Sequence, residues 1–267
     1  MKIVKFSSGL GNQVFYYLFF LFLKNKYSNE SIYGYYLKKD LKNHNGLEVS
    51  NVFAVNLPKA TFLSNLVSLC CHVLYKLGIK RYMEPCDPCK KNAILYCAYY
   101  QDQKYFLDNI SKIKFRKIDL DDTNKQILEL ILNTNSVSLH VRRGDYLNAE
   151  NIKIYGNIAT KDYYREAIKK VISQMNNPYF FIFSNDIEWC KKNLDIKNAI
   201  FVQNNRGANS YIDMFLMSKC KGNILANSSF SYWGAMLNEN DNKIVIYPQK
   251  WNNISTPDIF PQNWIGL

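Results

Sequence analysis

A chain of 267 residues, 48% of them hydrophobic, can bury a substantial core as one large domain or as two of ordinary size. The apolar run at residues 14–23 is too short to span a bilayer. This length excludes a membrane-spanning helix at these residues and suits a buried helix. The formal net charge of +12 indicates an anionic partner, and nucleotide phosphates, nucleic acid and an acidic membrane surface all fit.

We expect no secretory signal, because Met1 leads directly into a strand-like segment. An enzyme of the eukaryotic secretory pathway would normally carry an anchor, so we expect a bacterial cytoplasmic protein. A peripheral position at the inner membrane stays open. The odd number of cysteines, seven, indicates reduced thiols.

A lone CxxC pair, Cys86 and Cys89, raises the question of a zinc site. The other candidate ligands share only their residue types and an irregular spacing: Cys70, Cys71, His72 and Cys97. Since no second pair matches, buried or loop thiols are the better interpretation.

The chain begins with a strand at residues 2–6 and a glycine turn, residues 9–13, that opens the first helix. Gly9 and Gly11 allow tight turning and close approach of the backbone to a ligand. The N–H groups at the start of a helix favour an anion. A simple strand-to-helix turn is an equally good interpretation.

The middle of the chain has no clear period over residues 41–58, and residues 62–77 then form a strongly apolar helix. That helix is interpreted as core, with a position on a membrane surface as the alternative. A helix at residues 125–132 precedes the expected domain boundary, which gives domains 1–134 and 135–267.

The C-terminal half alternates strands and helices, which predicts βαβ units and a doubly wound parallel sheet. The strands are expected at 137–141, 179–183, 199–202, 224–226 and 244–247. The helices are expected at 161–175 with Thr160 as N-cap, 187–193, 210–221 ended by Gly222, and from about 232.

The segment at residues 137–146 is the most informative, because an alternating strand runs into a loop with Arg142, Arg143 and Asp145. Ligands of open α/β sheets bind beyond the carboxyl ends of strands. The chain has six Arg against 28 Lys, and two of the six lie side by side here. Arg grips a phosphate with a planar fork, although a solvated charged turn would look similar.

A second loop, Asn227 to Ser231, repeats the arrangement after the strand at 224–226. Small hydroxyl and amide side chains before a helix are ordinary N-caps and also suit a phosphate. Asp213 lies in the first turn of the helix before it, where it either balances the helix dipole or accepts the N1–H and N2–H of guanine.

Asp119 and Asp121 match a DxD pattern that some transferases use for a metal. They stand just before a helix, so we interpret them as first-turn acids and a cap, with no metal site.

With these motifs in place, the chain resembles bacterial α-1,2-fucosyltransferases of glycosyltransferase family 11 over nearly its whole length. The motifs that carry the resemblance occur in the family's order: residues 9–13, the HxRRxD motif at 140–145, residues 183–190, residues 216–218 with 227–235, and Trp264-Ile265. Two departures, Tyr232 for Trp and Tyr16 for Gln, are expected to alter acceptor fit more than chemistry.

The resemblance implies a GT-B-like α/β fold of two Rossmann-like domains with the active site in the cleft between them. It implies an inverting, metal-independent transfer of L-fucose from GDP-β-L-fucose to the 2-hydroxyl of a terminal galactose. The C-terminal domain would hold GDP-fucose. The N-terminal domain would hold most of the acceptor, an oligosaccharide or a lipid-linked glycan, with no nucleic acid and no cofactor.

The resemblance also assigns residues to the site. Those expected to contact GDP-fucose are Gly11, Asn12, His140, Arg142, Asp213, Asn227, Ser228, Ser229 and Phe230. Arg143 is expected to point away and support the loop. For the catalytic base, Asp145 is the first candidate, with orientation of Arg142 as its alternative role, and Glu150, ten residues after His140, is the second. Another fucosyl linkage, another GDP-sugar, or a basic nucleic-acid or membrane-binding protein are the alternatives.

Overall fold

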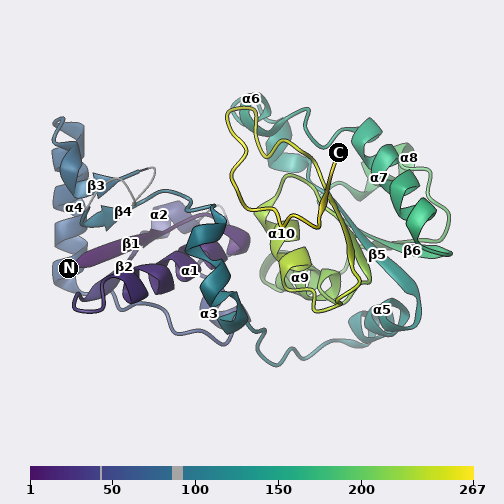
Figure 1. Cartoon of the computed structure of the whole chain (residues 1–267), viewed down its shortest axis with the longest axis horizontal. Helices are drawn as coiled ribbons and strands as arrows, with labels where there is room; N and C mark the ends of the chain where they lie inside the picture. The colour runs from purple at the N-terminus through teal and green to yellow at the C-terminus, as the bar shows by residue number, and fades with distance from the viewer. Residues whose placement is uncertain (43, 86–92) are drawn as a thin grey trace. The chain divides into compact units, whose positions relative to one another are not determined.

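The computed structural model describes residues 1–42, 44–85 and 93–267, which form two units (Figure 1). The first unit is Met1–Arg116 and the second is Lys117–Leu267. Each has its own parallel sheet. The alternation of elements predicted the sheet of the second unit, and the family resemblance implied that of the first. The division comes earlier than the expected boundary at 134, because helix α5 (Asp122–Asn133) packs on the second sheet, where Ile127 and Ile131 join the cluster of Phe181.

The first sheet has four parallel strands in the order β2-β1-β4-β3. Its strands are β1 (Lys2–Phe6), β2 (Ile32–Tyr36), β3 (Met83–Glu84) and β4 (Leu95–Tyr96). The helices of this unit are α1 (Leu10–Lys26), α2 (Lys38–Leu41), α3 (Val49–Val52) and α4 (Phe62–Lys76), with 3-10 turns η1 (Lys80–Tyr82), η2 (Gln103–Tyr105) and η3 (Leu107–Lys112).

Helices α1 and α4 cover the two faces of the first sheet. Alternate side chains of β1 point to opposite faces, and each side packs on one of these helices. Phe6 packs edge-on against Tyr16 of α1, with ring centroids 5.9 Å apart. Ile3 joins the cluster that contains Cys71 of α4. The apolar run at 14–23 therefore lies in a buried helix, as predicted.

Helix α4 contradicts the expectation that it forms core. Its helical conformation is confirmed, but its large apolar side chains, among them Phe62, Leu66 and Leu69, are exposed. The side chains that it buries are small and mostly polar, among them Ser64 and Ser68.

The second sheet has six parallel strands in the order β10-β9-β8-β5-β6-β7. Its strands are β5 (Asn135–Val141), β6 (Pro178–Ser184), β7 (Ala199–Val202), β8 (Gly222–Ile224), β9 (Ile244–Tyr247) and β10 (Ile265–Gly266). The helices besides α5 are α6 (Ile152–Tyr155), α7 (Lys161–Gln174), α8 (Ile187–Asn193), α9 (Tyr211–Met217) and α10 (Ser229–Met236), with 3-10 turns η4 (Gly144–Leu147) and η5 (Gly207–Asn209).

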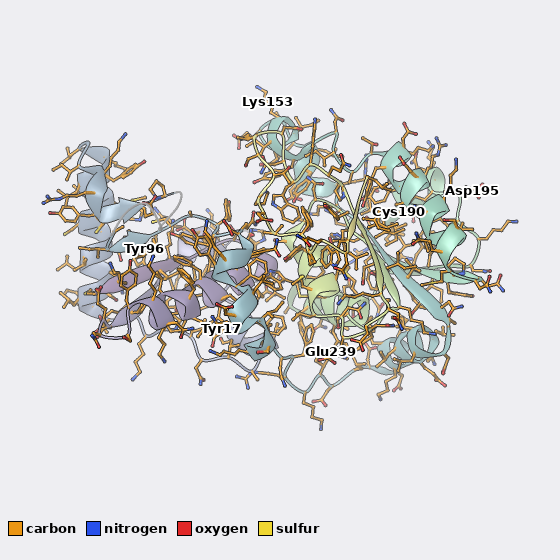
Figure 2. All side chains as sticks on the ribbon, in the orientation of Figure 1. Tyr17, Tyr96, Lys153, Cys190, Asp195 and Glu239 are labelled. Carbon is orange, nitrogen blue, oxygen red and sulfur yellow. The ribbon has the colours of Figure 1, made fainter. Side chains whose placement is uncertain are left out.

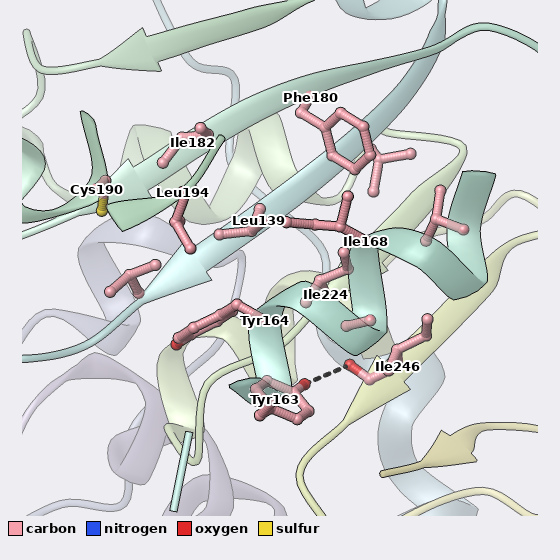
Figure 3. Packing of buried hydrophobic residues seen from close by; sticks show 14 residues of the cluster. Leu139, Tyr163, Tyr164, Ile168, Phe180, Ile182, Cys190, Leu194, Ile224 and Ile246 are labelled. Atoms are coloured by element: carbon pink, nitrogen blue, oxygen red, sulfur yellow. Dashed lines mark hydrogen bonds between the residues drawn. The ribbon is translucent and has the colours of Figure 1, made fainter. Parts of the chain in front are cut away.

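One face of this sheet is covered by α7, as Figure 3 shows. Leu139 and Phe180 point to this face and pack with Ile168, while Tyr163 donates hydrogen bonds to the carbonyls of Leu225 (2.7 Å) and Ile246 (3.3 Å). The opposite face packs on α5 and α9. In Figure 2, Cys190 lies in the interior of this unit and Asp195 at its surface.

Most predicted boundaries of this unit are confirmed, including Thr160, whose hydroxyl caps α7 by accepting from the N–H of Tyr163 (3.2 Å). The larger differences are in four elements. Helix α5 begins at 122 rather than 125, α9 ends at Met217 rather than 221, β8 spans 222–224 rather than 224–226, and α10 begins at 229 rather than about 232. Gly222 does not end a helix; it pairs within the sheet, where a Cβ would come within 3.3 Å of the Ile244 carbonyl.

The two sheets share one topological feature. In each, the chain first places strands on one side of its first strand and then crosses to the other side, so the switch points lie between β1 and β4 and between β5 and β8. In the first sheet the chain forms the outer strand β3 before β4. Ligands of doubly wound sheets bind at the carboxyl edge at such switch points. No helix in the described part of the chain is long and apolar enough to cross a bilayer.

Candidate active site

The switch point of the second sheet brings together two loops that are far apart in the sequence. One follows β5 and carries residues 142–147, and the other joins β8 to α10. The hydroxyl of Tyr146 donates to the carbonyl of Asn227 (3.0 Å), and the ring of His140 lies 5.9 Å from that of Phe230. The predicted convergence of the HxRRxD motif with the serine loop is therefore present in this unit.

Arg142 keeps part of its side chain accessible at this edge. Its Nη2 lies 2.9 Å from Oδ1 of Asp145, and its guanidinium lies 5.7 Å from the ring centroid of Tyr146. An ion pair that is about one-third exposed contributes only about 0–1 kcal/mol to stability. Its main consequence is orientation, because the carboxylate restricts the guanidinium to one side of the loop.

Arg143 points the other way, as predicted, and ties the loop to α8. Its Nε donates to Oδ2 of Asp186 (3.0 Å), and its guanidinium lies 4.4 Å from the ring centroid of Trp189. Its backbone N–H donates to the side chain of Asn185 (3.0 Å). The neighbouring Gly144 has a φ of +26°, and a Cβ there would overlap the Asn185 amide, so glycine is required.

His140 is buried and uncharged. Burial, and secondly the charge of Arg142, lower its pKa to about 3, so the imidazole stays neutral near pH 7. Its Nδ1 is buried without a hydrogen-bond partner in the described part of the chain. The Tyr164 hydroxyl fixes the backbone by donating to the His140 carbonyl (3.0 Å). Such a group can form a hydrogen bond to a ligand but is too weak to act as a base.

The start of α10 supplies backbone donors at the same edge. Ser228 is the N-cap, and its hydroxyl accepts from the N–H of Phe230 (3.3 Å). The helix dipole makes the surroundings of Ser229 favourable for an anion. Both amide hydrogens of Asn227 are used within the fold, by the carbonyls of Tyr155 and Trp251 (3.2 Å each), which fixes this loop.

Asp213 is part of a polar network that three elements build. Asn205, in the loop after β7, donates to Oδ1 of Asp213 (2.7 Å) and exchanges two hydrogen bonds of 2.9 Å with Asn124 of α5. Burial raises the pKa of Asp213 to about 7, while the bond from Asn205 opposes that shift. A carboxyl held in one orientation and titrating near neutrality is typical of a functional site.

The remaining acids and thiols are placed as follows. Glu150 is exposed between η4 and α6. Asp121 caps α5 by accepting from the Asn124 N–H (2.8 Å), as predicted, while Asp119 is almost fully exposed. Within the described ranges, no group of three or more His, Cys, Asp and Glu could hold a metal. Cys86 and Cys89 lie outside the described residues.

The switch point of the first sheet contains Asn12 and two residues that the sequence did not indicate. Gln101 donates to Oδ1 of Asn12 (3.2 Å), and Tyr99, 48% exposed, stacks on Tyr16 with ring centroids 6.3 Å apart. Gly11 is buried in the first turn of α1.

Gln13 of the same glycine motif serves the fold rather than a ligand. Its amide donates to the carbonyls of Ser8 (2.9 Å) and Gly46 (2.8 Å), and its Oε1 accepts from the N–H groups of Glu48 and Val49 (2.8 and 3.1 Å). One fully buried amide thereby holds a loop more than thirty residues away.

Sequence reasoning missed five site residues: Tyr99, Gln101, Asn124, Tyr146 and Asn205. Tyr146 directly follows the HxRRxD motif, and this adjacency could have indicated it. The amide pairs join residues 81 and 89 positions apart, and no local pattern identifies such partners.

Comparison with known proteins agrees with this geometry. A profile of glycosyl transferase family 11 matches residues 82–267. The chain belongs to that family. It is therefore a glycosyltransferase, and the family resemblance predicted from the motifs is confirmed.

Two relatives from Escherichia coli match nearly the full length. An alpha-1,2-colitosyltransferase is 32% identical over 99% of this chain and 98% of the relative. The O-antigen biosynthesis glycosyltransferase WbnK is 31% identical over 98% of each. A galactoside alpha-(1,2)-fucosyltransferase 1 from Saimiri boliviensis boliviensis is 29% identical over 49% of this chain and 38% of its own length.

Among solved structures, the family 11 chain is similar to the NodZ alpha-1,6-fucosyltransferase co-crystallized with GDP. The TM-score is 0.53 at 11% identity, covering 88% of this chain and 92% of that one. This likeness supports the α/β, GT-B-like fold that was predicted.

The two departures from the usual family motifs lie at buried positions. Tyr232 is fully buried, and its hydroxyl donates to the Ile259 carbonyl (2.7 Å). Tyr16 is also buried, near Ser7 (3.2 Å between hydroxyls). The expected effect of both residues on acceptor fit stays a prediction, and from buried positions it would act through packing.

Proposed function

We propose that this family 11 enzyme transfers L-fucose from GDP-β-L-fucose to the 2-hydroxyl of a terminal galactose, with inversion at the anomeric carbon. One observation carries the proposal: the Arg142 loop and the N-terminus of α10 meet at the switch point of the second sheet. Family membership and the α-1,2 names of the relatives support the linkage.

The second unit is suited to the nucleotide half of the donor. The Arg142 guanidinium and the N–H groups near Ser228 and Ser229 would bind the diphosphate, because both favour anions. The carboxylate of Asp213 would accept the N1–H and N2–H of guanine. The neutral imidazole of His140 would contribute a hydrogen bond.

The chemical step is a displacement in which the galactose 2-oxygen forms a bond to C1 of fucose as the bond from C1 to GDP breaks. Negative charge grows on the departing diphosphate, where Arg142 and the donors of α10 would stabilise it. The proton of the 2-hydroxyl must pass to a base. Asp145 is already paired with Arg142, which favours an orienting role and leaves Glu150 as the candidate base.

The first unit is suited to a neutral sugar. Asn12, Gln101 and Tyr99 carry no charge, and together they offer amide donors and acceptors beside an exposed aromatic ring. We propose that Gln101 and Tyr99 contact the acceptor, a galactose-terminated oligosaccharide or a lipid-linked glycan, while Asn12 keeps the contact with GDP-fucose that the family resemblance implies. The O-antigen role in the name of one relative fits such a substrate.

The transfer is proposed to need no metal, because Arg142 and the α10 N-terminus supply the positive potential that Mg²⁺ would otherwise provide. We expect full activity in excess EDTA. Loss of activity on chelation, with recovery on adding Mg²⁺ or Mn²⁺, would contradict this and return attention to Asp119 and Asp121.

The decisive experiment incubates the enzyme with GDP-fucose and a panel of β-galactosides, and determines the linkage and anomeric configuration of the product by NMR. A colitosyl donor belongs in the panel, because a full-length relative is named for colitose transfer. Colitose lacks the 3-hydroxyl of fucose, so a site that binds this hydroxyl would discriminate strongly between the two. Preference for the colitosyl donor would replace fucose in the proposal.

A further inference from the structure

Helix α4 presents an apolar face to solvent along its whole length. The exposed side chains recur at helical spacing and continue just past the end of the helix: Phe62 (85%), Leu63 (59%), Leu66 (47%), Leu69 (56%), Val73 (49%) and Leu77 (72%). At 1.5 Å per residue, the helix is about 22 Å long. We call this set the α4 face. Soluble proteins rarely expose a continuous apolar surface of this kind unless it binds something.

The opposite side of α4 explains why the apolar side faces outward. Ser64 and Ser68 are fully buried, and the Ser68 hydroxyl donates to the Ser64 carbonyl (2.7 Å). Cys71 is buried with Ile3 and Leu95 of the first sheet. Small side chains let the helix lie close to the sheet, and its large apolar residues are left without a partner in the described part of the unit.

The charges around the α4 face have one sign. Residues 49–83 contain no Asp or Glu, whereas Lys59, Lys76, Lys80 and Arg81 are all present and exposed. Two of these cations lie beside aromatic rings, with Lys80 at 6.0 Å from the Tyr75 centroid and Arg81 at 4.5 Å from that of Tyr82. Tyrosines next to basic residues are characteristic of segments at a membrane–water interface.

We propose that the α4 face docks on the surface of an anionic lipid bilayer, with its leucines at the boundary of the acyl chains and its basic residues on the lipid headgroups. An amphipathic helix with this distribution lies in the plane of the interface. Charge decides against a second copy of the chain. Two α4 faces in contact would oppose lysine with lysine in either orientation, because the segment has no acidic residue.

The proposal goes beyond the proposed function, since it concerns where the enzyme works rather than which sugar it transfers. A bilayer-bound enzyme would meet a lipid-linked acceptor in two dimensions. The docking itself requires neither GDP-fucose nor a galactoside, so it is tested without either.

The test is flotation of the full chain with vesicles of phosphatidylglycerol, and with vesicles of phosphatidylcholine alone. We expect strong binding to the first and weak binding to the second. Leu69→Glu should reduce binding at least tenfold, because it removes a leucine from the interface and adds a repelled charge. Leu132→Glu in α5 is the matched control, since Leu132 is 57% exposed, and it should bind like the wild type.

A second pair of variants separates charge from apolar contact. Lys80→Gln and Arg81→Gln should each weaken binding to phosphatidylglycerol vesicles about fivefold, which corresponds to about 1 kcal/mol per basic residue near such a surface. Added salt should weaken the wild type in the same way. Circular dichroism and glycosyl transfer to a soluble acceptor would show that each variant is folded.

Three outcomes would overturn the proposal. The first is a wild type that ignores phosphatidylglycerol vesicles. The second is equal loss of binding in Leu69→Glu and Leu132→Glu. The third is a protein that does not bind vesicles but forms a concentration-dependent dimer by light scattering, and whose dimer is abolished by Leu69→Glu. That result would assign the α4 face to contact with a second copy of the chain.

Discussion

The two switch points of this enzyme each lie beside the first strand of a parallel sheet, and their side chains differ in chemistry. In the second unit the edge between β5 and β8 carries Arg142, Asp145 and the start of a helix. In the first unit the edge between β1 and β4 carries Asn12, Gln101 and the exposed ring of Tyr99. The sheet supplies a place for a ligand in both units, and the side chains at its edge decide which ligand.

Under the proposed function, the difference in charge between the two edges follows the ligand rather than the fold. A diphosphate needs fixed cations and backbone donors. The second unit places two of the six arginines of the chain at this edge, where Arg142 would face the ligand while Arg143 holds the loop. A neutral sugar needs amides, hydroxyls and an aromatic surface, and the first unit would provide them. Substitutions at each edge should therefore change the kinetic constants of different substrates.

The largest effect is expected for Arg142→Lys. Both residues carry charge, but only arginine keeps the planar fork, so kcat should fall on the order of 10²–10³, as for loss of a preorganised donor. Steady-state kinetics at saturating donor would measure it. Arg165→Lys on exposed α7 is a control that should have no effect. A near-normal rate for Arg142→Lys would remove this residue from the donor site.

The next effect in size is expected for Asp213→Asn. The substitution replaces an acceptor oxygen with a donor that opposes a guanine N–H. Hydrogen bonds to charged groups contribute about 1.5–3 kcal/mol, so the preference for GDP over ADP as inhibitors should fall roughly 10- to 100-fold. Unchanged discrimination would show that the base is read by other residues.

The raised pKa of Asp213 adds a pH signature to this prediction. Below about pH 7 the carboxyl is increasingly protonated and loses acceptor capacity, so GDP binding should weaken as pH falls, by at most about tenfold per unit. Stability should change in the opposite direction. A raised native pKa favours the protonated folded state, so its stabilising contribution is present at low pH and is lost as pH rises through about 7. Calorimetry on wild type and Asp213→Asn should show both trends only in the wild type.

A smaller effect should separate the two acids near Arg142. Asp145→Asn should raise donor KM by no more than about fivefold and leave the pH profile of kcat unchanged, since a partly exposed ion pair contributes about 0–1 kcal/mol. Glu150→Gln should bind donor normally, lose about tenfold in kcat, and lose the acid limb of the profile. The reverse pattern would make Asp145 the base. If neither change lowers kcat tenfold, no single side chain is an indispensable base.

The smallest effect on a kinetic constant is expected at the uncharged edge of the first unit. Tyr99→Ala should raise acceptor KM about fivefold, the effect of losing about 1 kcal/mol of aromatic contact, and leave donor KM unchanged. Leu107→Ala is a matched control, since Leu107 is 46% exposed in the same unit. A change in donor KM instead would contradict the assignment of the donor to the edge of the second unit and of the acceptor to the edge of the first.

Local sequence signals determined much of this protein. The alternation of apolar residues predicted β5, a continuous apolar run predicted β6, the Thr160 hydroxyl cap predicted the start of α7, and the motif order predicted the family. These features depend on residues within a few positions of one another. Hydrogen bonding and side-chain periodicity act at that range, so a single sequence contains the information.

Only the tertiary structure decided the pairings and the exposed faces. It paired Arg143 with Asp186, and it joined Asn205 to Asn124 across 81 positions. Strand order brings such residues together, and local pattern does not contain strand order. Helix α4 is the clearest case. Its sequence shows that one side is apolar, but which side is buried depends on how closely the helix lies on its sheet, and the small side chains of Ser64 and Ser68 allow the closer approach.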